Sequence, residues 1–266
     1  MQDVLQRSPS AAADPEREAV RDFWNRNVHE WKVARHEPGS REWFREIEEY
    51  RFEKLHYLPR IVDFAGYAGR SVLDVGCGVG NDLARFAAGG ARVTGVDLAE
   101  RSVELARRNF RQRGLDGTFL LMDGERLALR DDSFDCVYCH TTLQFTPRPE
   151  AMVREIHRVL RPGGTAILMG VNRRSWLYAL QGVMKVEIDH LGAPVYHRFT
   201  SGEMRSMCAP FRDVRIVPER FPVPTKVHGG LKARVYNLCF VRLFHLFPRA
   251  WTRWSGHHLV AFATKG

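Results

Sequence analysis

The stretch Val72-Leu-Asp-Val-Gly-Cys-Gly-Val-Gly-Asn-Asp-Leu83 decides the fold of this 266-residue chain. It begins as an apolar run typical of a buried strand, turns through Gly76, Gly78 and Gly80, and continues after Asn81 as a helix. Closely spaced glycines let backbone N–H groups and a helix N-terminus approach a ligand that side chains would keep away. The stretch therefore predicts a nucleotide-type binding turn between a strand and a helix.

The spacing of the glycines distinguishes this turn from a dinucleotide site. The dinucleotide fingerprint is Gly-x-Gly-x-x-Gly, but Asn81 stands at its last position and the third glycine comes one residue early, at Gly80. Asp74 lies two residues before the first glycine, where its carboxylate would repel a pyrophosphate and attract an amino group or a sulfonium. The pattern therefore disfavours a nicotinamide oxidoreductase.

Acidic residues also follow the next two predicted strands. The run over 91–96 ends in Asp97, and the run over 118–122 is followed by Asp123 and Gly124. An acid at a strand tip about twenty residues after a glycine turn is placed to accept both ribose hydroxyls. Asp123 before a glycine also suits a plain turn. The order of the three signals along the chain favours a nucleoside site.

These motifs resemble those of a known family. Asp74-x-Gly-x-Gly-x-Gly80 looks like motif I of the class I S-adenosylmethionine (SAM)-dependent methyltransferases. The segments 132–140 and 159–168 are similar to the later motifs of the broad group that includes the ubiquinone and menaquinone C-methyltransferases. The resemblance covers residues 70–170 and is specific to cofactor and fold rather than to substrate.

The resemblance implies a cofactor, a product and a set of contacts. SAM would be the methyl donor and S-adenosylhomocysteine (SAH) the product, and no metal ion is implied. The acid after the third strand lies near the adenine amino group in the family, and Asp123 takes that position here. The implied cofactor-binding residues are Asp74, Gly76, Cys77, Gly78, Gly80, Asp97, Leu98, Asp123, Gly124 and His140.

The chain beyond the glycine turn predicts an α/β fold. Strands and helices alternate, which is typical of a mostly parallel sheet with helices on both faces and sites at the carboxyl ends of the strands. With the last strand antiparallel, as in the family, we expect a Rossmann-like, seven-stranded sheet. The predicted strands are 71–75, 91–96, 118–122, 134–139, 163–169, 211–221 and 257–263.

Helices are expected before the sheet and within its last connection. Asp14 and Pro15 begin a helix that should run to about residue 33, and Ser40 caps a second helix that should continue to Pro59. In the family such helices cover the cofactor and line the acceptor pocket. The expected parts are a disordered tail at 1–14, an N-terminal helical cap at 15–69, and a methyltransferase domain at 70–266 with a helical insert at 222–256.

The net charge of +9 is concentrated near the end of the chain. From Arg205 to Gly266 there are eleven lysines and arginines but two acidic residues, and neither acid falls within 222–256. On a helical wheel from Leu231 to Phe247, the polar side chains other than Lys232, at the helix start, gather in one sector of about 140° and the remaining arc is apolar. This pattern fits a helix on a membrane surface or a lid over an apolar substrate. A helix packed on the sheet edge is the alternative.

Histidines are the candidate catalytic bases. Methyl transfer from a sulfonium is an in-line displacement that depends on geometry, with or without a base. His140 comes first, because the family architecture places the tip of the fourth strand at the cofactor cleft, followed by His197 and His36. For each of them a structural hydrogen bond or a surface position is the alternative interpretation.

Composition favours a reduced, cytoplasmic protein. No stretch approaches the roughly 20 apolar residues of a spanning helix, and the N-terminal residues do not look like a secretory signal. Cys136 and Cys139 lie in one predicted strand, whose period of two places them on opposite faces and argues against a zinc or redox pair. We expect a cytoplasmic location, peripheral to a membrane if the insert binds one.

The predicted function is SAM-dependent methylation of a small, apolar, aromatic or lipid-like acceptor at oxygen, carbon or nitrogen. RNA methylation is one alternative, because the isoelectric point is 9.6, although the basic residues are interleaved with aliphatic ones and nucleic acid is not the expected partner. A module that binds SAM or SAH without turnover is the other. The patterns specify neither the acceptor molecule nor the oligomeric state.

Overall fold

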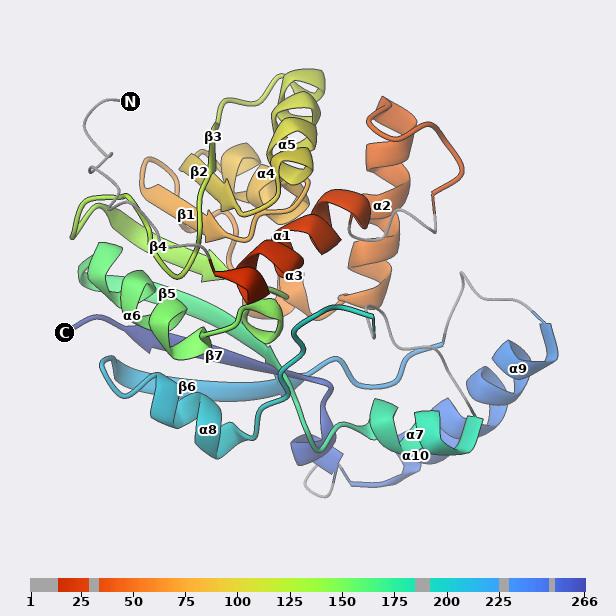
Figure 1. Ribbon diagram of the computed structural model, residues 1–266. Helices are drawn as coiled ribbons and strands as arrows, with labels where there is room; N and C mark the ends of the chain where they lie inside the picture. The colour runs from red at the N-terminus through yellow and green to blue at the C-terminus, as the bar shows by residue number, and fades with distance from the viewer. Residues whose placement is uncertain (1–13, 29–33, 185–191, 225–229, 249–251) are drawn as a thin grey trace.

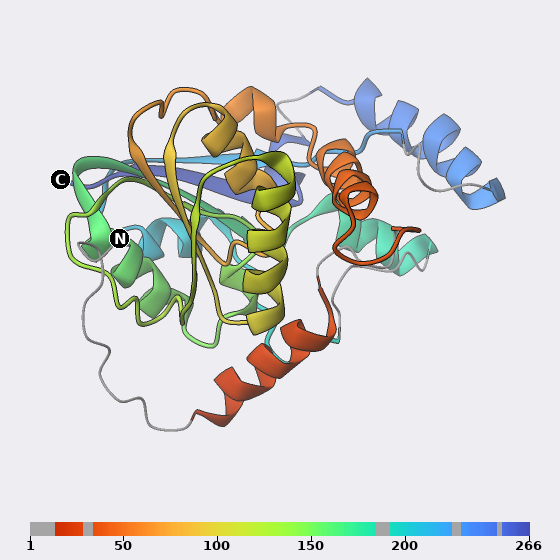
Figure 2. The ribbon, with the colours of Figure 1, turned by 90° about the horizontal axis from the view of Figure 1, so that it is seen from above.

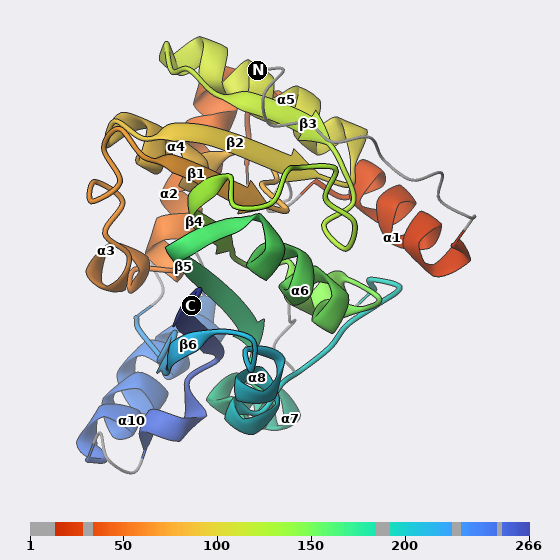
Figure 3. The ribbon, with the colours of Figure 1, turned by 90° about the vertical axis from the view of Figure 1, so that its left-hand side faces the viewer.

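A single sheet forms the centre of the protein. The computed structural model describes residues 14–28, 34–184, 192–224, 230–248 and 252–266. The strands are β1 (Ser71–Val75), β2 (Arg92–Asp97), β3 (Thr118–Leu121), β4 (Phe134–Cys139), β5 (Leu160–Val171), β6 (Arg212–Glu219) and β7 (His258–Thr264). They form one seven-stranded sheet in the order β3-β2-β1-β4-β5-β7-β6 (Figures 1 and 3).

Strand directions confirm the predicted fold. β1 pairs in parallel with β2 and β4, so that Val72 lies opposite Val93 on one side and Cys136 on the other. β7 inserts between β5 and β6 and runs antiparallel to both. The sheet is therefore mostly parallel with an antiparallel last strand, and the carboxyl ends of β1, β2 and β4 meet along one edge.

Helices cover both faces of the sheet, because the strands are apolar on both sides. One face packs against α3 (Leu58–Ile61), α4 (Asn81–Ala88) and α5 (Glu100–Arg113), and the other against α6 (Pro149–Val159) and α8 (Ser201–Met207). Figure 2 shows the sheet between these layers. Cys136 faces the first layer and Cys139 the second, as the strand period predicts.

The first predicted helix is shorter than expected. Helix α1 (Pro15–Arg26) begins after Asp14, whose carboxylate accepts a hydrogen bond from the Arg17 backbone N–H at 3.4 Å. It ends at Arg26 because the side-chain amide of Asn27 donates to the Phe23 carbonyl at 2.9 Å and closes the last turn. The expected tail, apart from Asp14, and residues 29–33 lie outside the described part of the chain.

The second predicted helix is divided in two. Helix α2 (Arg41–Lys54) begins after Ser40, as predicted, but ends at Lys54 instead of continuing to Pro59. Pro59 lies in the first turn of α3, where its missing N–H has no helical partner to lose. The break between α2 and α3 turns Tyr57 into the interior, where its side chain is fully buried.

The insert before the last strand is helical but not a regular α-helix. It contains α9 (Gly230–Val235), a π-helical segment η3 (Tyr236–Val241), α10 (Arg242–Leu246) and the short turn η4 (Arg253–Ser255). The π turn rotates α10 relative to α9, so the regular wheel expected from the sequence does not hold through the segment. Phe240 and Phe244 pack against the ring of Trp176, in α7 (Trp176–Met184), with centroid distances of 5.7 and 6.4 Å. Figure 1 shows α10 beside α7.

No described helix combines the length and the apolar composition that crossing a membrane requires.

Candidate functional site

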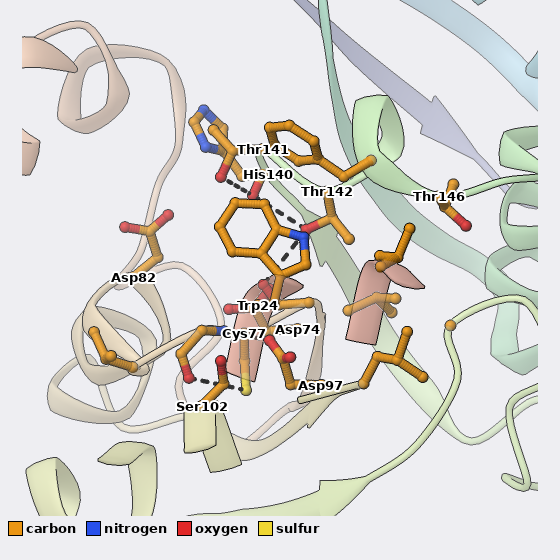
Figure 4. A pocket seen from close by; sticks show the side chains of 18 of the residues that line it. Trp24, Asp74, Cys77, Asp82, Asp97, Ser102, His140, Thr141, Thr142 and Thr146 are labelled. Carbon is orange, nitrogen blue, oxygen red and sulfur yellow. Dashed lines mark hydrogen bonds between the residues drawn. The ribbon is translucent and has the colours of Figure 1, made fainter. Parts of the chain in front are cut away.

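A pocket lies at the carboxyl ends of β1, β2 and β4, where a doubly wound sheet places its ligand. Figure 4 shows it from close by. Its polar end comes from the glycine turn and the strand tips, and its apolar end from α1, α2 and the turn η2 (Leu143–Phe145). Among the predicted cofactor residues, those that line it are Asp74, Gly76, Cys77, Gly78, Asp97, Leu98, Asp123, Gly124 and His140.

The glycines of the turn have different roles. Gly76, Gly78 and Gly80 all adopt positive φ angles, of 77°, 53° and 78°, which disfavour any residue with a Cβ atom. A Cβ on Gly76 would collide with the side chain of Thr142, whereas a Cβ on Gly78 would meet no protein atom within 4 Å. Gly80 does not line the pocket; it precedes α4 and would meet the Phe110 ring at 3.2 Å.

Asp97 connects the second strand to the glycine turn. Its carboxylate accepts one hydrogen bond from the Gly78 N–H and one from the Ala99 N–H, both at 2.9 Å. Burial raises the pKa of Asp97, and these backbone donors oppose the shift. The carboxylate is therefore fixed in orientation at the tip of β2 while it lines the pocket.

Asp74 is a buried carboxylate at the polar end of the pocket. Its residue is 3% exposed, and it makes no hydrogen bond or ion pair within the described part of the chain. Burial and the neighbouring charge of Asp82 raise its pKa well above the usual value, against the opposing charge of Arg51. A cationic ligand group would relieve this uncompensated charge.

Asp123 already has protein partners. Arg17, on α1, donates to Asp123 Oδ2 at 2.8 Å, and the Glu125 N–H donates to Oδ1 at 2.9 Å. The second contact is the turn that a plain Asp-Gly sequence suggests. Sequence reasoning missed Arg17, which carries no motif and lines the pocket from α1.

A buried ion pair that sequence reasoning also missed lies beside His140. Arg51 donates from Nε and Nη2 to the two carboxylate oxygens of Asp82, at 2.7 and 2.6 Å, and the Tyr138 hydroxyl donates to the same carboxylate at 2.8 Å. Burial, the largest single influence, would raise the pKa of Asp82, but the charge and hydrogen bonds of Arg51, with the Tyr138 hydrogen bond and the neighbouring His140, together outweigh it and lower the pKa to about 2. Asp82 lies two residues after Gly80, and this closeness to the glycine turn was a usable signal in the sequence. No sequence signal pointed to Arg51.

His140 follows β4 and lines the pocket with both ring nitrogens in contact with protein groups. Nδ1 lies 3.3 Å from Arg51 Nη2, and Nε2 lies 2.9 Å from the Tyr57 hydroxyl. Burial and the charge of Arg51 lower the pKa of His140 to about 3, so the ring is neutral at physiological pH. The next residue, Thr141, has a φ of 63°, a conformation rare outside glycine, and also lines the pocket.

The other two candidate histidines lie away from this pocket. His197 is half-buried and its backbone N–H donates to the Gln144 carbonyl at 2.7 Å, but it does not line the pocket. His36 is exposed and its Nδ1 lies 3.0 Å from Glu46. The structure therefore brings His140 together with the predicted cofactor residues and does not bring His197 or His36 there.

The other end of the pocket is apolar. Trp24 of α1 points into it (Figure 4) and contacts the ring of Phe145 edge to face, with centroids 4.9 Å apart. Val28 and Ile47 line the same end. The pocket thus combines a polar, acidic half with an apolar, aromatic half, an arrangement suited to a charged nucleoside beside a less polar second ligand.

Comparisons with known proteins agree with this geometry. Residues 73–168 match the family model described as a methyltransferase domain. A ubiquinone biosynthesis O-methyltransferase from Pseudomonas paraeruginosa is 34% identical over 164 residues, which are 59% of this chain and 70% of that protein. The protein of the same name from Nitrosococcus oceani is 31% identical over 195 residues, which are 68% and 80% of the two chains.

Solved structures share the fold. A SAM-dependent methyltransferase from Thermotoga maritima superimposes with a TM-score of 0.60 at 22% identity, covering 93% of this chain and 100% of that one. Magnesium protoporphyrin IX methyltransferase from Synechocystis, crystallised with bound SAM, gives a TM-score of 0.59 at 16% identity, with coverage of 97% and 100%.

Proposed function

The chain belongs to the class I SAM-dependent methyltransferases, and we propose that it methylates a hydroxyl group on a small apolar or aromatic acceptor. The observation that carries the proposal is the apolar end of the pocket, lined by Trp24, Val28, Ile47 and Phe145. The relatives named as ubiquinone biosynthesis O-methyltransferases support oxygen as the methylated atom, where the sequence motifs left oxygen, carbon and nitrogen open.

The polar end of the pocket fits the cofactor. When bound, SAM supplies a sulfonium whose methyl group is open to displacement. In our assignment the buried, unpaired carboxylate of Asp74 binds the amino group of SAM, and Asp97 binds the ribose hydroxyls. Gly78 leaves space beside the turn that a Cβ would fill. Asp123 serves the adenine amino group, sharing its carboxylate with Arg17.

The protein's part in the reaction is to align two ligands and exclude water. Helix α1 covers the pocket, held at one end by the pair between Arg17 and Asp123 and at the other by Trp24 against Phe145. The neutral ring of His140 and the ionised pair of Arg51 with Asp82 set the polarity of the wall between the two ends.

An acceptor panel tests the proposal. Purified protein is incubated with labelled SAM and phenols or catechols that carry or lack an alkyl chain, and methylated products are identified by mass spectrometry. We expect O-methylation that favours the alkyl-bearing compounds. Trp24→Ala should raise KM for these acceptors at least tenfold. The control is Trp176→Ala, which removes a ring that packs on the insert and should leave this KM unchanged.

Other results of the panel would contradict the proposal. Methylation at carbon or nitrogen alone would refute the assigned atom, and label transfer to tRNA but to none of the small molecules would support RNA methylation instead. Transfer to both chain-bearing and chain-free phenols at equal rates would refute the role given to the apolar end.

We also propose that the insert contacts an anionic lipid surface. Among the described residues, every exposed large apolar side chain except Leu121 lies between Leu231 and Trp254. These side chains are Leu231, Val235, Leu238, Leu243, Leu246, Phe247 and Trp254. Arg242 and Arg253 are exposed beside them, and the segment has no acidic residue. Apolar side chains next to cationic ones suit the interface of an anionic membrane.

Vesicle flotation tests the lipid contact. We expect the protein to float with phosphatidylglycerol-containing vesicles and not with neutral phosphatidylcholine vesicles. The pair Leu238→Glu and Leu246→Glu should abolish flotation, whereas Leu121→Glu, an exposed apolar position elsewhere, should not change it. Equal flotation of the wild type and the double variant would refute the contact between the insert and the lipid surface.

A further inference from the structure

Five buried or half-buried side chains form a hydrogen-bonded chain that leads away from the pocket. From Arg51 Nη2 it passes to His140 Nδ1 at 3.3 Å, and from His140 Nε2 to the Tyr57 hydroxyl at 2.9 Å. The hydroxyl lies 2.6 Å from His258 Nδ1, and His258 Nε2 lies 3.2 Å from Arg220 Nη1. We call Arg51, His140, Tyr57, His258 and Arg220 the buried chain.

The two ends of the buried chain are held differently. Arg51 is fixed by its two-point pair with Asp82, and its residue is 9% exposed. Arg220 is half-buried, and its guanidinium makes no other hydrogen bond or ion pair with any described residue. Arg220 can therefore turn away from its partner, whereas Arg51 cannot.

The direction of each hydrogen bond follows from the number of protons. A guanidinium only donates, and a neutral imidazole carries a single N–H. If Arg51 donates to His140 Nδ1, the proton of His140 is on Nε2 and is donated to Tyr57, whose hydroxyl then donates to His258 Nδ1. The proton of His258 is then on Nε2, where it faces the Arg220 guanidinium, donor against donor.

The opposite direction places the conflict at the pocket. If Arg220 donates to His258 Nε2, the remaining protons all reverse and the proton of His140 is on Nδ1, facing Arg51. Arg51 cannot move without breaking its buried pair with Asp82, whose rupture would leave a buried charge. The first direction is favoured, since its single conflict is relieved when Arg220 turns.

We propose that Tyr57 and His258 are positioning residues that hold neutral His140 with its proton on Nε2. The Nδ1 atom is the ring nitrogen on the pocket side, because it lies beside Arg51, which lines the pocket, whereas Tyr57 does not. Its lone pair can accept a hydrogen bond from an acceptor hydroxyl in competition with the long contact to Arg51. The tautomer would thus select acceptors that carry an O–H group.

The surroundings of the buried chain keep its histidines neutral. Burial and nearby positive charge lower the pKa of both His140 and His258. The other charged or titratable groups around the chain include Asp74, Asp82, Tyr138, Lys54, His56, His257 and Glu219. The consequence for the acceptor rests on the proposed function, but the tautomer is a property of the protein alone.

Nitrogen NMR of histidine-labelled protein without acceptor tests the tautomer. The ¹⁵N signals of His140 and His258 are assigned by their loss in His140→Gln and His258→Gln. We expect both rings to be neutral and protonated on Nε2 at pH 7. Tyr57→Phe keeps the ring and removes the hydroxyl, so it should shift His140 to a mixture of tautomers. Tyr67→Phe, a tyrosine on the same face of the sheet but outside the chain, should leave His140 unchanged.

Kinetics with a hydroxyl acceptor give the second readout. Tyr57→Phe should lower kcat about tenfold, as for one misplaced hydrogen bond, with the Kd for SAM unchanged by calorimetry. A wild-type His140 protonated on Nδ1, or an unchanged spectrum in Tyr57→Phe, would overturn the inference. The predicted spectra together with no O-methylation of any acceptor would uphold the positioning role and refute the proposed function.

Discussion

Gly76 and Gly78 share a left-handed backbone conformation but face different surroundings. The space beside Gly76 is filled by Thr142, so this glycine permits the close approach of the β4 tip to the turn. The space beside Gly78 is open, so this glycine keeps the pocket clear. One motif therefore contains a glycine required by packing and a glycine beside open space, which we assign to the ligand.

This difference predicts distinct phenotypes for two similar substitutions. Gly78→Ala should lower stability by about 1–2 kcal/mol, from the positive φ angle alone, and weaken SAM binding at least tenfold. Gly76→Ala adds a collision with Thr142 and should cost about 3 kcal/mol or more. Thermal unfolding and titration calorimetry check both variants. A Gly78→Ala protein that binds SAM normally would contradict the assignment of that space to the cofactor.

The Arg51–Asp82 pair predicts a strong coupling between two residues. Arg51→Met leaves the Asp82 carboxylate buried without its main partner and should cost about 3–5 kcal/mol. Asp82→Asn in the same protein removes the stranded charge and should recover part of the loss. Denaturant unfolding of the two single variants and the double variant measures the coupling, and additive losses would contradict a direct pair.

At the scale of elements, one side of the insert packs against the rest of the protein and the other side is exposed. Its inward rings, Phe240 and Phe244, contact Trp176, and Phe244 also approaches Phe221 at 6.4 Å. Its outward side carries Leu246, which is 79% exposed. The π turn produces this division, which a regular helical wheel cannot show.

Two substitutions in the same short helix should separate anchoring from surface contact. Phe244→Ala removes ring contacts and should loosen the insert, seen as faster hydrogen exchange across 230–246 and a stability loss of about 1–3 kcal/mol. Leu246→Ala should leave stability unchanged within about 0.5 kcal/mol and weaken vesicle flotation. Equal exchange rates in the two variants would show that the inward rings do not anchor the segment.

For the whole molecule, the buried histidines make stability depend on pH. Both His140 and His258 have lowered pKa values in the folded state, about 3 for His140, against an ordinary value of 6.5. Between these values the unfolded chain binds more protons, so stability is greatest above pH 6.5 and falls as the pH decreases. The raised pKa of Asp74 acts in the opposite sense above pH 3.8 and reduces the net slope.

We expect the free energy of unfolding to fall between pH 6.5 and pH 4 by up to about 1.4 kcal/mol per pH unit for each neutral histidine. Chemical denaturation at several pH values measures the slope. His258→Gln should reduce it, whereas His36→Gln, at an exposed position, should not. If His258→Gln leaves the slope of unfolding free energy against pH unchanged, the pH dependence must come from other groups.

Sequence by itself determined the parts that depend on local backbone chemistry. The glycine turn and the acids that follow the strands are encoded within a few residues of each other, so Asp74, Gly78 and Asp97 could be predicted and lie in one pocket. The alternation of strands and helices likewise determined the sheet, because its apolar strands must be covered on both faces.

Only the tertiary structure decided what surrounds His140. Arg51, Tyr57, Arg220 and His258 come from segments far apart in the sequence, and none of them carries a motif. They meet because β7 inserts beside β5 and because the break between α2 and α3 turns Tyr57 inward. Burial then selects their hydrogen bonds and protonation, since polar groups removed from water must pair with whatever the packing brings to them.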